Sequence, residues 1–344
     1  MKIINPEIEV MHHGLEKDFM TPEQFIEKVG RTCYKSEDKI TETSAEKFVS
    51  GLVKRGHEAM VEHWSLIFKT TAGDFDGIRA DWFMVMAYVS REEEANQTPE
   101  DKRLKPFIRF TVNEADNEIR YIISGNMRAW RDYLAAWTKK YAWIPDYLHN
   151  IVRDYPTFFP EYQEMIQTSF FNDVLTPITV NDLVGDFEHS VHHDVTVKFI
   201  CDRGVSHEIV RHRTASFAQE STRYCNYGLD KFDQCITVIE PQFIKNAIHA
   251  DNIEVLHSWE KACCVAEAEY FKLLELGSTP QEARSVLPNS LKTEVIMTGN
   301  LDCWDHFFNL RCAPDAHPDI QVVAKMVRGE FHQLFPERYL PFGR

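Results

Sequence analysis

Residues 211–224 read Arg211-His212-Arg213-Thr214-Ala215-Ser216-Phe217-Ala218-Gln219-Glu220-Ser221-Thr222-Arg223-Tyr224, and this stretch is the densest in polar chemistry of the 344-residue chain. Guanidinium groups offer forked donors that match phosphate, and the neighbouring hydroxyls complete a cradle for it. Arginines this close repel one another unless an anion or carboxylates neutralise them. The stretch therefore favours an anion pocket over a solvated polar loop, although composition alone does not decide which anion.

The segments around this stretch predict helices at several places. Residues 205–210 read as a helix, so the arginines lie where an element ends and a ligand can reach them. Capping boxes at 21–24, 43–46 and 279–282 predict three helix starts, and we expect the second helix to end at Gly56. Pro318 predicts the start of a last helix. Its apolar stripe, which we expect in the core, consists of Ile320, Val323, Val327 and Phe331.

Strand signals are fewer. Residues 64–70 and 195–200 carry β-branched and aromatic side chains, and residues 107–112 and 119–123 resemble a hairpin. The segment from 73 to 194 differs in character, with an acidic patch at 91–101 and an aromatic-rich run from 130 to 171. Because no linker brackets it, we interpret 73–194 as an inserted, mostly helical subdomain of unknown role. The chain as a whole is predicted to be a mixed α+β protein.

Composition excludes several classes of function. The chain has 53 acidic and 38 basic residues, a net charge of −15, which disfavours binding to nucleic acid. The N-terminus lacks a basic region followed by an apolar run, and the longest apolar run, 82–89, is too short to span a membrane. Eight scattered cysteines without a CxxC pair suit reduced thiols, so we expect a cytoplasmic protein without disulfides.

Common cofactor and metal motifs are absent from the sequence. It contains neither GxGxxG nor GxxxxGK[ST]. His57 and His63 are six residues apart, so on a helix they could not share a zinc ion as an HExxH pair does. The cluster at 188–194 is more typical of a solvated or locally bonded group than of a metal site. We therefore predict no metal.

Arg211-His212-Arg213, followed seven residues later by Ser221, resembles the RHR-x7-S signature of the flavin-dependent thymidylate synthases. Further similarities lie in the order that the family shows, at 31–34, 56–63, 283–288, Asn300 and 309–311. The likeness covers about 1–72 and 195–335, so we expect 1–72 and 195–344 to form the family core. It implies a mixed or antiparallel sheet packed with helices.

The resemblance also implies site residues. Arg311 would be catalytic, because a guanidinium against the uracil ring favours its N3-deprotonated form. The residues implied to bind dUMP are Glu208, Arg211, Gln219, Glu220, Ser221, Thr222, Arg223 and Arg284. Those implied to bind FAD are His57, Glu62, Arg211, His212, Arg213, Gln219, Asn300, Asp302 and His306.

Three positions depart from the family pattern. Glu208 stands where glutamine is frequent, and Asp302 stands where an arginine is common. Residues 316–320 read Ala-His-Pro-Asp-Ile where the family usually shows A-Q-x-E-I, so glutamine has become His317. This last change either alters the handling of folate or nicotinamide or only re-caps the last helix.

The implied activity is reductive methylation of dUMP to dTMP, with methylenetetrahydrofolate as carbon donor and NADPH-reduced FAD as hydride source. No Pro-Cys dipeptide is present, so the cysteine nucleophile of the classical enzyme is missing. The resemblance further implies a homotetramer. One alternative keeps the fold and changes the product, as a flavin-dependent pyrimidine-nucleotide hydroxymethylase or other pyrimidine-modifying enzyme. Another, a catalytically silent nucleotide-binding protein, is disfavoured by Arg223, Arg284 and Arg311.

Overall fold

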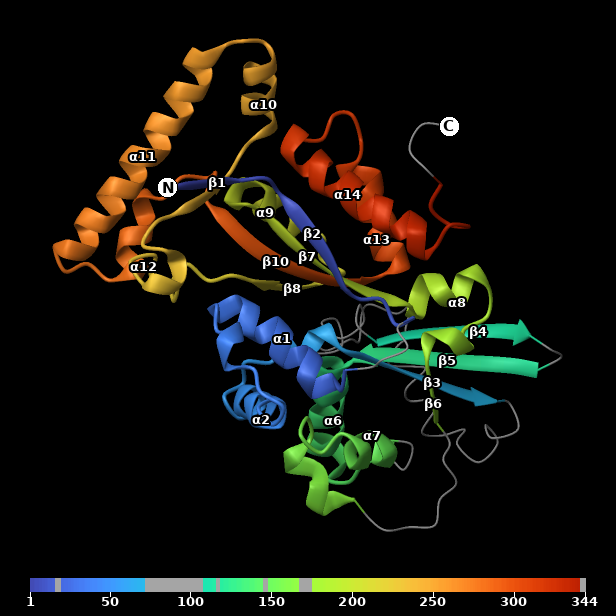
Figure 1. The fold of residues 1–344 in the computed structure, drawn as a ribbon. Helices are drawn as coiled ribbons and strands as arrows, with labels where there is room; N and C mark the ends of the chain where they lie inside the picture. Colours follow the sequence, from blue (N-terminus) through green and yellow to red (C-terminus); the bar gives the residue numbers. More distant parts are fainter. Residues whose placement is uncertain (16–19, 72–107, 116–117, 145–147, 167–174, 341–344) are drawn as a thin grey trace.

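The computed structural model describes residues 1–15, 20–71, 108–115, 118–144, 148–166 and 175–340 (Figure 1). The acidic patch at 91–101 and the apolar run at 82–89 lie outside these residues. The described chain contains two four-stranded antiparallel sheets, a short parallel strand pair and helices packed around them. This arrangement confirms the predicted α+β class. None of the described helices is long and apolar enough to cross a membrane.

The first sheet has the strand order β2-β7-β10-β8, with every neighbouring pair antiparallel. Its strands are β2 (Glu7–His12), β7 (Asp194–Asp202), β10 (Lys292–Asn300) and β8 (Ser216–Gln219). Strand β7 contains the predicted strand at 195–200. It pairs with β10 over its whole length, from Lys292 opposite Asp202 to Asn300 opposite Asp194. Most side chains of these two central strands are buried, because helices cover both faces of the sheet.

One face of this sheet packs against α9 (Arg203–Ile209), α13 (Leu301–Arg311) and α14 (Pro318–Leu334). The predicted apolar stripe of α14 is fully buried, and α9 confirms the helix expected at 205–210. The other face packs against α1 (Pro22–Tyr34), which begins with the predicted capping box between Thr21 and Gln24. Figure 1 shows α13 and α14 on the opposite side of the sheet from α1.

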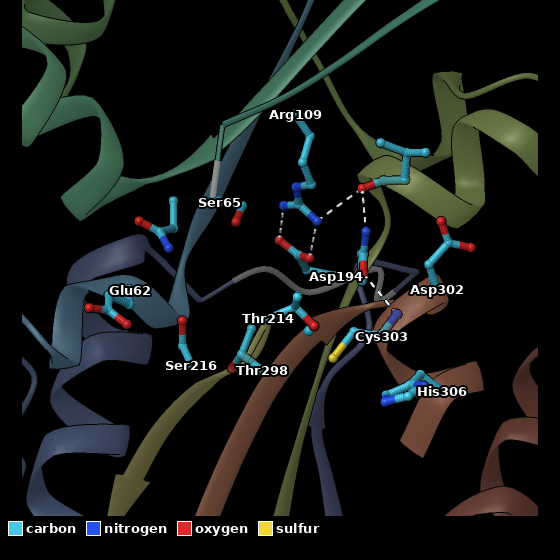
Figure 2. Close-up of a pocket in the computed structure, with 14 residues that line it drawn as sticks. Glu62, Ser65, Arg109, Asp194, Thr214, Ser216, Thr298, Asp302, Cys303 and His306 are labelled. Carbon is cyan, nitrogen blue, oxygen red and sulfur yellow. Dashed lines mark hydrogen bonds and ion pairs between the residues drawn. The ribbon is translucent and has the colours of Figure 1, made fainter. Parts of the chain in front are cut away.

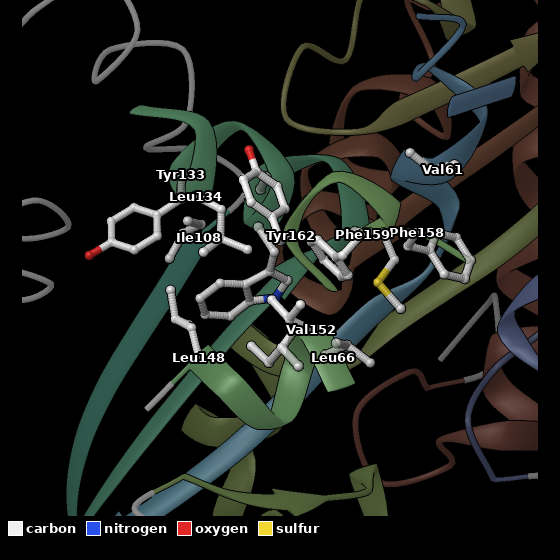
Figure 3. Close-up of a cluster of buried hydrophobic side chains, with 14 of the residues drawn as sticks. Val61, Leu66, Ile108, Tyr133, Leu134, Leu148, Val152, Phe158, Phe159 and Tyr162 are labelled. Atoms are coloured by element: carbon white, nitrogen blue, oxygen red, sulfur yellow. The ribbon is translucent and has the colours of Figure 1, made fainter. Parts of the chain in front are cut away.

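The second sheet has the order β4-β5-β3-β6. Strands β4 (Ile108–Ala115) and β5 (Glu118–Asn126) form the predicted hairpin, while β3 (Ser65–Thr71) pairs with β5 and with β6 (Thr176–Ile178). The helices near this sheet are α6 (Met127–Tyr141), α7 (His149–Asp154) and α8 (Gly185–His192). Figure 3 shows the apolar cluster that joins α6, α7 and β3. Since β3 precedes residue 73, the segment 73–194 shares a sheet with the predicted core, and its treatment as an insertion stays a prediction.

A third group of elements extends away from both sheets (Figure 1). Strands β1 (Lys2–Ile4) and β9 (Thr237–Ile239) pair in parallel. They are followed by α10 (Gln242–His249), α11 (Ile253–Glu275) and α12 (Pro280–Ala283), and α12 begins with the capping box predicted at 279–282. Helix α11 has only two buried residues, Cys263 and Tyr270, so most of this long helix faces solvent.

The capping box predicted at 43–46 is wrong. Helix α2 (Ala45–Lys54) has Ser44 as its N-cap, and this serine makes no side-chain cap hydrogen bond. Its hydroxyl instead donates to the buried carboxylate of Glu27 on α1, at 2.7 Å. A tertiary hydrogen bond has therefore replaced the local one. The helix ends at Lys54, two residues before Gly56, which has the positive φ of +69° that glycine adopts without strain.

Buried neutral histidines make the fold sensitive to acid. Burial lowers the pKa of His63 to about 4, of His192 to about 3 and of His193 to about 4. His192 bridges the hairpin strands through Thr111 Oγ1 at 2.9 Å and Ser124 Oγ at 2.7 Å. Within the described part of the chain, no three His, Cys, Asp or Glu residues are grouped so that they could hold a metal ion.

We expect the free energy of unfolding to fall as the pH drops from about 6.5 to about 4, because the unfolded chain then binds protons that these buried imidazoles do not. Each such histidine steepens the fall by up to about 1.4 kcal/mol per pH unit. Urea denaturation at several pH values measures the slope. His63→Asn should flatten it, whereas His257→Gln, at an exposed position on α11, should not. Equal slopes in both variants would contradict this account.

Candidate functional site

The Arg211-His212-Arg213 stretch forms the turn between α9 and β8. His212 is buried, with only 4% of its surface exposed, and its ring lies edge-on to Phe307 of α13. Arg211 and Arg213 are exposed on either side of it. Neither guanidinium makes a hydrogen bond or ion pair with the rest of the described chain. The stretch thus combines one buried ring with two solvent-accessible cations that an anion can reach.

Arg311, at the end of α13, is held directly against this turn. Its Nε donates to His212 Nε2 at 3.1 Å, its Nη1 to the Glu208 carboxylate at 2.7 Å and its Nη2 to the Glu208 backbone oxygen at 3.0 Å. Burial, with Arg311 and His306 adding to it, lowers the pKa of His212 to about 4. The imidazole is therefore neutral at pH 7, so Nε2 accepts the bond from Arg311 and Nδ1 carries the proton.

Glu208 acts in this structure as the partner of Arg311. A carboxylate at position 208 is an unfavourable neighbour for a phosphate. In this structure it forms an ion pair with the guanidinium of Arg311, the predicted catalytic residue. Arg311 bonds both the carboxylate and the backbone oxygen of Glu208, and these two bonds fix the plane of the guanidinium more firmly than a single bond would. The departure from glutamine at position 208 therefore changes the charge next to Arg311.

A cavity of about 380 Å³ lies beside this cluster, between the two sheets (Figure 2). Four of the predicted flavin-binding residues line it: Glu62, Asn300, Asp302 and His306. The remaining lining residues are Ser65, Arg109, Asn126, Val191, Asp194, Thr214, Ser216, Thr298, Gly299 and Cys303. Of the other residues predicted to bind FAD, His57, Arg211, His212, Arg213 and Gln219 do not line this cavity.

The cavity wall contains a bidentate ion pair that sequence reasoning missed. Arg109 of β4 donates through Nη1 and Nη2 to the two carboxylate oxygens of Asp194, each at 2.7 Å. Burial would raise the pKa of the Asp194 carboxyl, but the Arg109 guanidinium lowers it below its ordinary value. Arg109 and Asn300 also both donate to the backbone oxygen of Val191, at 2.9 Å (Figure 2). Arg109 lies in the segment that the family resemblance does not cover, so no sequence motif pointed to it.

Asn300 has two roles at this cavity. Its side-chain oxygen accepts from the backbone of Cys303 at 3.0 Å and so caps α13, while its amide nitrogen bonds Val191. The cap fixes where α13 begins. It thereby also positions Asp302 and His306 on the first turns of that helix, at the rim of the cavity.

The residues predicted to hold dUMP make hydrogen bonds to several different parts of the protein. Gln219 donates to Ser206 Oγ at 2.9 Å, and the Ser221 backbone donates to Cys33 O at 3.0 Å. Arg284 Nη1 donates to Thr222 Oγ1 at 3.0 Å, and Arg223 donates to Gln281 at 3.0 Å. Both arginines are exposed.

Glu220 differs from the other predicted dUMP residues. Its side chain is only 2% exposed and accepts from Lys292 at 3.0 Å. Its carboxylate is thus paired with a cation inside the protein.

Residues 177–337 match the family model described as thymidylate synthase complementing protein. The chain is 34% identical over 139 residues to the flavin-dependent thymidylate synthase of Geobacter sulfurreducens, covering 39% of this chain and 55% of that protein. It is 35% identical over 124 residues to the flavin-dependent thymidylate synthase of Pyrococcus horikoshii, covering 36% of this chain and 48% of that protein. The chain thus spans about half the length of these curated relatives.

A solved structure, described as a UMP/dUMP methylase PolB from Streptomyces cacaoi bound with 5-Br dUMP, shares 25% identity and a TM-score of 0.38 with this chain. The match covers 45% of this chain and 80% of that one. A TM-score this low does not establish a shared fold.

The match of residues 177–337 to this family model confirms the resemblance found in the sequence. The two relatives described above carry the name flavin-dependent thymidylate synthase.

Proposed function

We propose that this protein is a flavin-dependent thymidylate synthase, which converts dUMP to dTMP with methylenetetrahydrofolate as carbon donor and NADPH-reduced FAD as hydride source. The main support is the Arg311 guanidinium, held at 2.7 Å by Glu208 and at 3.1 Å by the buried, neutral His212. A fixed cation at the end of α13, next to a turn with two accessible arginines, suits an anionic pyrimidine nucleotide.

The cavity between the sheets fits a flavin in size and chemistry. Its volume of about 380 Å³ is in the range of small-molecule sites. Arg109 lines this cavity, and its Nε is buried and has no partner among the described residues. We propose that Glu62, Asn300, Asp302 and His306 hold the flavin there, with His57, Arg211, His212, Arg213 and Gln219 completing its contacts. A reduced flavin, when bound, supplies hydride.

The chain's own residues would activate the nucleotide electrostatically. Arg311 would lie against the uracil ring, favour its N3-deprotonated form and so make C5 nucleophilic, which removes the need for a cysteine nucleophile. Arg211, Arg223 and Arg284 would neutralise the monophosphate, because forked guanidinium donors match its oxygens. Gln219 at the end of β8, with Ser221 and Thr222 in the loop after it, would complete the dUMP site, with Glu208 and Glu220 beside it.

The direct test is to incubate the purified protein with FAD, NADPH, methylenetetrahydrofolate and dUMP and to weigh the nucleotide product by mass spectrometry. We expect dTMP, and none when any one component is left out. A hydroxymethylated nucleotide would instead support the alternative enzyme on the same fold. Binding of dUMP with neither flavin binding nor product would support the silent nucleotide-binding protein.

The proposal includes a homotetramer in the cytoplasm, as the resemblance implies. The long α11, with most of its surface exposed, is available for contacts between subunits. Light scattering coupled to size exclusion measures the assembly, and a mass of one chain would contradict this part of the proposal.

A further inference from the structure

The cavity beside α13 has walls from both sheets. Asn300, Asp302 and His306 line it from the end of β10 and the start of α13. Ser65 of β3 and Arg109 of β4 line it from the second sheet, together with Asn126 at the end of β5. Figure 2 shows the Arg109 guanidinium reaching from the hairpin toward Asp194, at the beginning of β7. Part of the segment 73–194 therefore borders the same space as the predicted flavin residues.

Arg109 is the only lysine or arginine among the lining residues of this cavity in the described chain, whereas Glu62, Asp194 and Asp302 all carry carboxylates. Each carboxylate has a guanidinium partner. Arg128 bonds Glu62 at 2.5 Å, Arg338 bonds Asp302 at 3.4 Å, and Arg109 bonds Asp194. Carboxylates repel phosphate, so a wall balanced in this way suits a polar ring system better than a phosphate group.

Arg109 retains hydrogen-bond donors for such a ring. A guanidinium has five N–H donors. Two of them bond Asp194 and a third bonds Val191 O. This leaves one hydrogen on Nη2 and the one on Nε, which is buried without a partner in the described residues. A buried donor without a partner is costly, and a carbonyl oxygen of a bound heteroaromatic ring would satisfy it.

We propose that Arg109 is a flavin-binding residue and that the β4–β5 hairpin forms one wall of the cofactor cavity. This inference rests on the proposed function, because it assumes that the cavity holds the flavin. Asp194 orients the guanidinium, and the two remaining donors bind carbonyl oxygens of the ring. Asp302 occupies the position where an arginine is common, so in this chain the cation at the cavity comes from a different element. The segment 73–194 would then have a role in binding the flavin.

Two variants separate a binding role from a structural one. Arg109→Ala and Asp194→Asn both break the bidentate pair that joins β4 to β7, but only the first removes the donors. We expect Arg109→Ala to weaken FAD binding at least about tenfold, which is about 1.4 kcal/mol. Asp194→Asn keeps the guanidinium and its donors and loses only the carboxylate that orients it, so it should weaken FAD binding less than Arg109→Ala does. Quenching of flavin fluorescence on titration with protein measures both affinities.

Circular dichroism establishes that each variant is folded, and Arg153→Ala, an exposed arginine on α7 in the same segment, serves as the matched control. Equal weakening in both variants would show that the pair only joins the sheets, and unchanged affinity in Arg109→Ala would equally overturn the inference. If either variant fails to fold, Ser65→Phe serves instead, because it narrows the cavity and keeps the Arg109–Asp194 ion pair. A tenfold loss of FAD affinity in Ser65→Phe supports the inference, and an unchanged FAD affinity overturns it. Wild-type protein that binds no FAD would overturn the proposed function as well.

Discussion

Replacing Arg311 by alanine should lower the turnover of dUMP at least about 100-fold, the loss expected when one preorganised electrostatic group is removed from a site. Flavin should stay bound, because Arg311 does not line the cavity. The fold should also survive. The substitution leaves Glu208 without its cation, but Glu208 is only half-buried and water can solvate its carboxylate.

Lysine at this position tests which property of Arg311 matters. Arg311→Lys keeps the charge but loses the planar fork that contacts His212 and Glu208 together, so we expect partial activity. Steady-state rates and flavin fluorescence are measured for both variants, with Arg153→Ala as the surface control. Turnover of Arg311→Ala within a few-fold of the wild type would remove Arg311 from the catalytic role.

The sequence predicted the elements of this site better than its contacts. Local patterns located β7, the hairpin, α9 and the stripe of α14, because capping, periodicity and β-branched residues act over a few neighbours. The bond between Arg311 and Glu208 joins residues 103 positions apart, and that between Arg109 and Asp194 joins residues 85 apart. No local signal encodes such pairs, since they depend on how the strands are ordered in each sheet.

One local prediction shows where tertiary structure took over. The capping box predicted at 43–46 did not form, and the hydroxyl of Ser44 bonds the buried Glu27 on another helix. A hydrogen bond to a buried carboxylate on another element outweighs the local preference for a helix cap. Glu208 also contacts another element, through its ion pair with Arg311, and its contact with dUMP stays a prediction.

Lys292→Met should produce the largest loss of stability that we predict. Lys292, with 17% of its side chain exposed, donates to Glu220 at 3.0 Å and to Glu294 at 2.5 Å. Lys35 forms a second ion pair with Glu294. Burial would lower the pKa of Lys292, but the two carboxylates outweigh it and raise it, so the ammonium stays charged. Without Lys292, Glu220 would remain buried and charged with no cation beside it.

Removing one partner of a buried ion pair typically costs about 3–5 kcal/mol, because the other charge is left uncompensated. We expect Lys292→Met to lose about 3 kcal/mol of unfolding free energy in urea denaturation near pH 7. Lys261→Met, at an exposed position on α11, should lose far less. The double variant Lys292→Met with Glu220→Gln should recover much of the loss, because it also removes the unpaired charge.

A double-mutant cycle tests the same explanation quantitatively. If an uncompensated carboxylate causes the loss, Lys292→Met should cost much less unfolding free energy in a Glu220→Gln background than in the wild type. An equal cost in both backgrounds would mean that Lys292 stabilises the protein by the packing of its hydrocarbon chain. The charge network would then contribute little, and the burial of Glu220 would need another explanation.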